Sequence, residues 1–235
     1  MKMANKSKIK MVFFDADGVI FDITGYTEKG KKVAISTWNY LFDKLNIYSE
    51  HERLKKLFIK GGFPSYMEWT DEACKVLQKY GLKKQKFMEI INAKSLMKGS
   101  KETFSELKRR GYKTALITGS FKASAERVQK IFGLDYITAH CDLIFDKKGN
   151  LKKWRLIPCD YEGKIKYFNK LIKKLNLTPA LCAYIGDEVN DIPIFKKVGL
   201  GIAFNCFKTG VKKAADIVID KKDLREILPY FPPII

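Results

Sequence analysis

The sequence has few cysteines and histidines and no long hydrophobic run. Its 235 residues include five cysteines and two histidines, and no two cysteines form a CxxC pair. An odd number of scattered cysteines argues against a disulfide scaffold or a zinc ribbon and favours a reducing compartment. The apolar run near the N-terminus ends at Asp15, and no other run approaches the length of a membrane span. We therefore expect a cytoplasmic protein with no signal peptide and no membrane partner.

Acidic residues are scarce relative to basic ones. Forty-five Lys and Arg against 26 Asp and Glu give a formal net charge of +19 at pH 7. A protein with this charge is attracted to polyanions at low salt, so a nucleic-acid-binding module is one class to weigh. However, the lysine pairs are dispersed, and no basic cluster contains interleaved aromatic residues for base stacking. A solvated basic surface is the favoured interpretation, with nucleic acid bound only nonspecifically if at all.

Short apolar segments that end in polar residues or glycine predict the strands of a parallel sheet. Runs without alternation suit strands that are buried on both faces. The predicted strands are Met11–Phe14, Thr114–Ile117, Leu181–Ile185, Gly201–Phe204 and Ile217–Ile219. Helical patterns lie between them; two stop at Gly111 and Gly133, and the clearest runs from Ile165 to Leu175. This alternation predicts an α/β fold with a doubly wound parallel sheet, in which ligands bind beyond the carboxyl ends of the strands.

The interval after the first strand is too long for a single crossover. It contains four helical patterns, centred near Trp38, Leu54, Trp69 and Phe87. Because no convincing strand pattern is present, we predict a small all-helical cap at residues 23–95, inserted into a catalytic core formed by residues 1–22 and 96–235. A later hairpin is predicted to turn at Gly149.

Two carboxylates follow the first predicted strand. Asp15 and Asp17 are separated by one residue and precede Gly18. Asp and Gly are common turn residues, so this pattern alone is as compatible with a structural turn as with a functional site. Polar motifs at other strand and helix ends favour a site, because the carboxyl ends of parallel strands meet at one edge of the sheet.

Three further motifs supply hydroxyl, ammonium and carboxylate groups. The segment Thr118–Ser120 offers a hydroxyl and backbone N–H groups to an anion, although Ser120 is also well placed to cap the next helix. Lys164 begins an amphipathic helix, which alone means little in a lysine-rich chain. Asp187 follows another strand, and Asp191 lies four residues later, where a simple helix cap is the alternative.

The order of these four motifs resembles that of the haloacid dehalogenase superfamily of phosphohydrolases. The spacing of 23 positions from Lys164 to Asp187 and the segment Lys196–Ala203 are most similar to its phosphoserine phosphatase branch. The resemblance implies a Mg²⁺-dependent phosphatase that hydrolyses a small phosphorylated metabolite through an aspartyl-phosphate, with the inserted helices as a cap over the active site. A phosphotransferase would share every motif.

The resemblance also implies a role for each motif residue. Asp15 is the nucleophile, Asp17 is the general acid and base, and Lys164 links Asp15 to the phosphate. The implied phosphate-binding residues are Thr118, Gly119, Lys164 and Asn190. The implied metal-binding residues are Asp15, Asp17 through its backbone carbonyl, and Asp187, with Asp191 in a supporting role. The chemistry requires such groups, because a dianionic phosphate repels a carboxylate unless a cation and a fixed ammonium offset the charge.

The sequence departs from that branch where the substrate is recognised. Phosphoserine phosphatases bind the substrate's ammonium with a glutamate, where this sequence has Thr24. They bind its carboxylate with a cap arginine, where this sequence has Asp71 and Glu72. Glu28 and Arg53 are substitutes if the alignment is shifted. Because burying an unpaired charge costs several kcal/mol, we expect a less polar or larger phosphomonoester to be preferred, with phosphoserine as the alternative.

Overall fold

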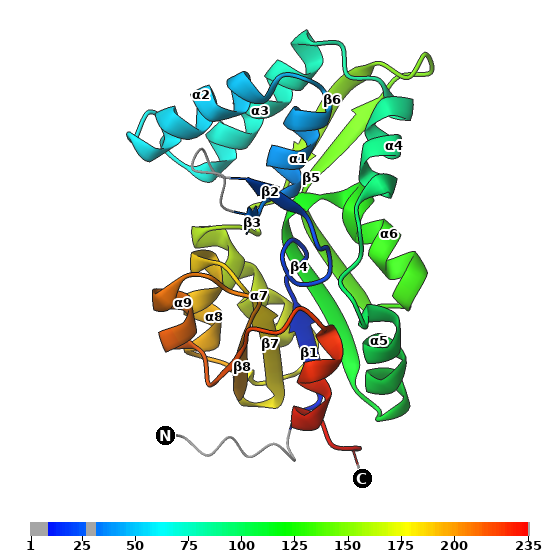
Figure 1. Cartoon of the computed structure of the whole chain (residues 1–235), viewed down its shortest axis with the longest axis vertical. Coiled ribbons are helices and arrows are strands. Elements are labelled where there is room, and N and C mark those ends of the chain that lie inside the picture. The colour runs from blue at the N-terminus through cyan, green and yellow to red at the C-terminus, as the bar shows by residue number, and fades with distance from the viewer. Residues whose placement is uncertain (1–8, 27–31, 235) are drawn as a thin grey trace.

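A seven-stranded, mostly parallel sheet forms the centre of the protein (Figure 1). The computed structural model describes residues 9–26 and 32–234. The strands are β1 (Met11–Phe14), β4 (Lys113–Phe121), β5 (Tyr136–Phe145), β6 (Leu151–Leu156), β7 (Cys182–Gly186), β8 (Leu200–Phe204) and β9 (Ile217–Ile219). Their order in space is β6-β5-β4-β1-β7-β8-β9, with β6 antiparallel to β5 and the other neighbours parallel. The predicted α/β fold is confirmed.

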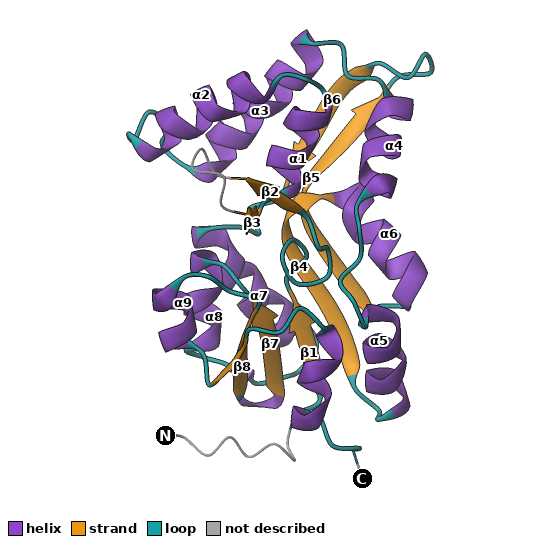
Figure 2. Ribbon diagram, in the orientation of Figure 1, coloured by secondary structure: helices purple, strands orange, loops and turns teal. Residues whose placement is uncertain are grey.

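Helices pack on both faces of the sheet (Figure 2). They are α5 (Ser100–Arg109), α6 (Lys122–Phe132), α7 (Glu162–Lys174), α8 (Ile192–Phe195), α9 (Thr209–Ala214) and the 3-10 helix η4 (Leu224–Tyr230). In β1, Val12 and Phe14 pack towards α5 and α6, whereas Met11 and Phe13 pack towards α7 and α8. This double burial explains why the strand sequences lack alternation. No helix in the described ranges is long and apolar enough to cross a bilayer.

The segment between β1 and α5 contains four helices and a small hairpin. The helices α1 (Thr37–Lys44), α2 (Tyr48–Ile59), α3 (Tyr66–Lys79) and α4 (Lys84–Ala93) match the four predicted patterns. Strands β2 (Thr24–Tyr26) and β3 (Lys32–Ala34) pair antiparallel, so the expectation that residues 23–95 contain no strand is wrong. Strands of three residues are too short to show the alternation that predicts a strand.

The inserted helices share a hydrophobic cluster with one end of the main sheet. In this cluster, buried side chains of α1, α3 and α4 lie with Phe121 of β4, Cys141 of β5 and Leu151 of β6. The Trp154 indole of β6 also donates a hydrogen bond of 2.7 Å to Asp71 on α3. The hairpin β5–β6, which turns at Gly149 as predicted, runs alongside the inserted helices in Figure 1. The hairpin and the inserted helices therefore form one packing unit.

Candidate active site

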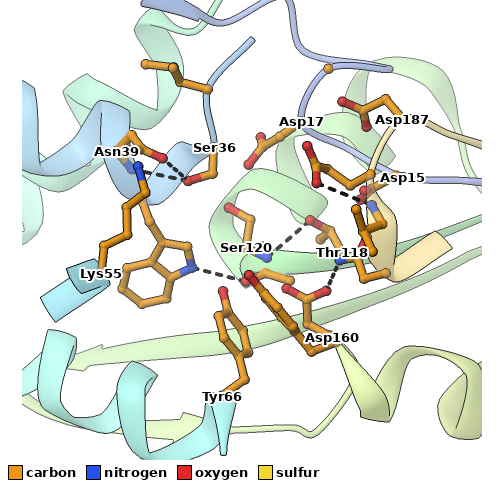
Figure 3. A pocket seen from close by; sticks show the side chains of 18 of the residues that line it. Asp15, Asp17, Ser36, Asn39, Lys55, Tyr66, Thr118, Ser120, Asp160 and Asp187 are labelled. Carbon is orange, nitrogen blue, oxygen red and sulfur yellow. Dashed lines mark hydrogen bonds between the residues drawn. The ribbon is translucent and has the colours of Figure 1, made fainter. Parts of the chain in front are cut away.

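Three neighbouring strands bring the predicted motifs together at one edge of the sheet. The central strand β1 lies between β4 and β7, so Asp15, Thr118 and Asp187 converge (Figure 3). A cavity of about 800 Å³ opens at this edge. The predicted residues that line it are Asp15, Asp17, Thr118, Gly119, Asp187 and Asn190. Lys164 and Asp191 are also buried, and Lys164 contacts both Asp15 and Asp191.

The Lys164 ammonium lies between two carboxylates. Its side chain is fully buried, with Nζ 2.9 Å from Asp15 Oδ2 and 2.6 Å from Asp191 Oδ1. Burial alone would lower the pKa of Lys164, but the Asp15 and Asp191 carboxylates raise it well above its usual range. Burial raises the pKa of Asp15 to about 8, against the opposing effect of Lys164. Lys164 is thus a permanent cation fixed beside the candidate nucleophile.

The carboxylates of Asp15, Asp187 and Asp191 form a cluster that can accommodate a cation. One oxygen from each lies within 4.8 Å of the others. Asp191 is saturated, because Oδ1 accepts from Lys164 and Tyr184 while Oδ2 accepts from the backbone N–H groups of residues 187 and 188. Asp187 differs, since its buried Oδ1 has no hydrogen-bond partner among the described residues. Burial, followed by the charge of Asp15, raises the pKa of Asp187 well above its usual range.

This distribution of hydrogen bonds fits a magnesium site. Mg²⁺ prefers oxygen ligands and is typically bound by one or two carboxylates together with water and substrate phosphate. Asp15 and Asp187 offer such oxygens, and among the residues that the structure describes Asp187 Oδ1 lacks the partner that a buried carboxylate requires. Asp191 also forms a capping box with Glu188, which matches the alternative interpretation of this residue as a helix cap.

Two glycines allow the chain to approach this cluster closely. Gly18 has a φ of 80°, and a Cβ at this position would lie 2.2 Å from Asp187 Oδ2. A Cβ on Gly119 would lie 1.7 Å from Asp160 Oδ2. No larger residue can occupy either position without displacing a carboxylate of the site.

Asp160 is a site residue that the motifs do not identify. It is buried, lines the cavity and accepts a hydrogen bond from Asn190 Nδ2. The resemblance assigns Asn190 to phosphate binding, but here the side-chain nitrogen of Asn190 is bonded to Asp160. Asn190 Oδ1 has no partner within the described parts of the chain. The only sequence signal for Asp160 is an acidic residue in the turn just before the helix of Lys164.

Thr118 and Ser120 lie inside a strand rather than beyond its end. Strand β4 continues four residues past the predicted end, and its pairing with β5 shifts register between Thr118 and Phe121. Ser120 does not cap the next helix, because α6 begins at Lys122 without a side-chain cap. The buried Ser120 hydroxyl has no partner among residues 9–26 and 32–234.

The Asp17 carboxylate is turned towards the start of α1 rather than towards Lys164. Thr37 donates to it twice, from its backbone N–H to Oδ2 and from its hydroxyl to Oδ1, both at 2.6 Å. Lys94 Nζ lies 3.8 Å from Asp17 Oδ1. Neither Thr37 nor Lys94 was found by motif analysis, because both belong to the inserted segment.

The inserted segment contributes much of the aromatic wall of the cavity. The aromatic lining residues are Trp38, Tyr48, Phe58, Tyr66, Trp69 and Tyr161. Tyr66 stacks on Tyr161 at 4.5 Å and on Trp69 at 5.2 Å between ring centroids. The Trp38 indole donates a 3.1 Å hydrogen bond to the Gly119 carbonyl, which joins this wall to the second motif.

Three of the residues considered for recognition of phosphoserine, Asp71, Glu72 and Arg53, are not at this wall. Asp71 and Glu72 do not line the cavity, and Asp71 is bonded to Trp154. Arg53 points away, pairing with Glu50 at 2.9 Å. Glu28 lies outside the described residues, as does the side chain of Thr24. Lys55 and Lys208 are the lysines among the described lining residues, and Figure 3 shows Lys55 beside Asn39.

Comparison with known proteins identifies the family. The model of the haloacid dehalogenase-like hydrolases matches residues 9–199. The chain belongs to this family. Its relatives and structural neighbours place it in the phosphoserine phosphatase-like branch, and it is a phosphomonoester hydrolase. The resemblance seen in the four motifs is thereby confirmed.

Two relatives and two solved structures illustrate the similarity. The phosphoserine phosphatase of Methanocaldococcus jannaschii is 40% identical over 134 residues, covering 56% of this chain and 62% of the relative. That of Wolinella succinogenes is 29% identical over 225 residues, covering 94% and 100%. A phosphoserine phosphatase in apo form superposes with a TM-score of 0.76 at 27% identity, over 95% of this chain and 99% of the other. A phospho-aspartyl intermediate analogue of phosphoserine phosphatase gives 0.75 at 28% identity, with the same coverage.

Proposed function

We propose that this hydrolase uses Mg²⁺ and Asp15 to transfer the phosphoryl group of a small phosphomonoester to water. The observation that carries the proposal is the fixed Lys164 ammonium beside Asp15, next to the unpartnered oxygen of Asp187. A cation held by Asp15 and Asp187 would, together with the Lys164 ammonium, offset the repulsion between the Asp15 carboxylate and an incoming phosphate. Phosphoryl transfer depends mainly on such positioning and charge stabilisation.

The reaction consists of two displacements at phosphorus. Asp15 attacks, an Asp–O–P bond forms, and the bond to the leaving oxygen breaks as Asp17 donates a proton to it. Asp17 then accepts a proton from water, which attacks phosphorus and releases Asp15. The Thr118 hydroxyl and the Gly119 N–H contact the phosphate oxygens. Asp15, Asp187 and the Asp17 carbonyl would hold Mg²⁺, which would supply charge neutralisation when bound.

The purified protein is expected to hydrolyse p-nitrophenyl phosphate when magnesium is supplied and to lose this activity in EDTA. Calcium should inhibit, because its 6–8 ligands at about 2.3–2.6 Å form a looser shell than the octahedral shell of magnesium at about 2.0–2.1 Å and displace the attacking carboxylate. Initial rates against the concentration of each ion, alone and in competition, provide the measurement. A full rate in EDTA would contradict the proposed metal site.

Phosphoserine is expected to be a poorer substrate than an aryl phosphate. The names of the relatives favour phosphoserine, and Lys55 and Lys208 line the cavity, but six aromatic side chains also line it and neither Asp71 nor Arg53 does. A zwitterionic amino acid needs a partner for each charge when it is buried, whereas a ring can pack on this wall. The test is kcat/KM for phosphoserine beside aryl, sugar and nucleotide phosphates. A hundredfold preference for phosphoserine would overturn this expectation. Glu28 would then be the first residue to test as the partner of the substrate's ammonium.

A further inference from the structure

Lys94 is a buried ammonium that the proposed mechanism does not use. Its side chain is fully buried, and its Nζ donates to the hydroxyls of Thr37 at 2.7 Å and Ser124 at 2.9 Å. The ammonium also lies 3.6 Å from the centre of the Phe21 ring, a cation–π contact. Its nearest carboxylate in the described chain is Asp17, at 3.8 Å. Burial of a charge is strongly unfavourable unless it is compensated, and the compensation here comes from these two hydroxyls, the ring and Asp17.

The contacts of Lys94 determine the direction of the Thr37 hydroxyl. A hydroxyl has one proton to donate and lone pairs with which to accept. Lys94 has no acceptor, so Thr37 Oγ1 must accept from it, and the single proton of Thr37 is left for Asp17 Oδ1 at 2.6 Å. The Thr37 N–H donates to the other oxygen of Asp17. Lys94 and Thr37 thus fix both oxygens of the candidate acid–base residue.

This chain of contacts lies where both connections of the inserted segment meet the core. Thr37 is the first residue of α1, and Lys94 directly follows α4. Beside them the two connections are hydrogen-bonded, from Asp22 N to Ser95 O and from Met97 N to Ile20 O. The position of Asp17 is consequently coupled to the position of the inserted segment.

We propose that Lys94, acting through Thr37, is a positioning residue that places Asp17 for proton transfer to the leaving group. This inference rests on the proposed function, in which Asp17 is the general acid. A displaced acid slows the first displacement most when the leaving oxygen is strongly basic, because a weakly basic oxygen departs without a proton. Loss of Lys94 therefore changes the dependence of rate on the leaving group and not merely the rate.

The test compares Lys94→Met and Thr37→Val with the wild-type protein on p-nitrophenyl, phenyl and ethyl phosphate, whose leaving groups become progressively more basic. Both substitutions preserve approximate size and remove the polar contact. Because a positioned general acid contributes about 10²–10⁴-fold, we expect kcat/KM to fall roughly ten- to hundredfold more on ethyl than on p-nitrophenyl phosphate. Thr37→Ser, which keeps the hydroxyl, should retain the wild-type dependence.

Lys113→Met is the matched control, because Lys113 is exposed and pairs with Asp135 at the opposite end of β4. It should leave all three rates unchanged. Equal losses on the three substrates in Thr37→Val would overturn the role of Lys94 even if Lys94→Met were too unstable to assay. Wild-type hydrolysis of p-nitrophenyl phosphate establishes the proposed function separately, so equal losses would leave that function standing.

Discussion

Asp15→Asn is expected to abolish turnover of p-nitrophenyl phosphate while preserving the fold. An amide oxygen is a far poorer nucleophile than a carboxylate, so the rate should fall by roughly 10³-fold or more, as for nucleophile loss in other hydrolases. Stability should change little, since Lys164 keeps Asp191 as its partner at 2.6 Å and the variant no longer buries the Asp15 charge. Steady-state rates and thermal unfolding curves measure the two effects.

Trapping of the phosphorylated protein makes this experiment sharper. Acid quenching during turnover should leave phosphate covalently bound to the wild type and not to Asp15→Asn. Asp22→Asn is a suitable control, because Asp22 is outside the cavity and pairs with the partly exposed Lys222. If Asp15→Asn retained the wild-type rate, or still became phosphorylated, the nucleophile would be another residue.

Asp187→Asn is expected to change stability in opposite directions with and without magnesium. Without metal, Asp187 is a buried carboxylate near Asp15 and Asp191, and one of its oxygens has no partner in the described part of the chain. Replacing it with a neutral amide removes this repulsion, so the metal-free variant should be more stable by about 1 kcal/mol, or roughly 2–4 °C in Tm for a chain of this size. With metal, the variant loses a charged ligand and should gain much less stability on addition of magnesium.

The pH dependence of the Asp187→Asn effect follows from the raised pKa of Asp187. Below the pKa of an aspartate in the unfolded chain, about 4, this carboxyl is neutral in both the folded and the unfolded wild type, as the amide is, so the metal-free proteins should differ little. As pH rises from that value to the raised pKa of folded Asp187, the folded wild type keeps a proton that the unfolded chain releases, and stability is lost progressively. The variant's advantage in EDTA should therefore be larger at pH 8 than at pH 5. An advantage that is constant with pH would contradict the raised pKa of Asp187, and an unchanged magnesium half-saturation point for activity would remove Asp187 from the metal site.

The motif residues were predictable because their placement depends on local sequence and on one rule of sheet geometry. A buried strand followed by Asp15, or by Asp187, is visible in a few consecutive residues. Parallel pairing of the strands then brings these ends together whatever the rest of the chain does. Lys164 required the resemblance as well, since its sequence environment is that of any surface helix.

Residues whose role depends on tertiary contacts were not predictable in this way. Lys94 and Thr37 are 57 positions apart, and they meet only because the two connections of the inserted segment run side by side. Asp160 belongs to a turn that is brought to Gly119 by the packing of α7. The first half of β5 was missed because Thr138 and His140 interrupt its apolar pattern, although both are buried.

The hydrophobic cluster that joins the inserted helices to the β5–β6 hairpin sets a practical limit on how this enzyme can be divided. Excising residues 23–95 would uncover Phe121, Cys141 and Leu151 together and leave an apolar patch across the end of β4 and the edge hairpin. Such patches cause self-association, so the remaining sheet would aggregate rather than serve as a minimal catalytic unit. By the same physics, a chimera that exchanges substrate specificity between relatives must transplant the hairpin along with the helices.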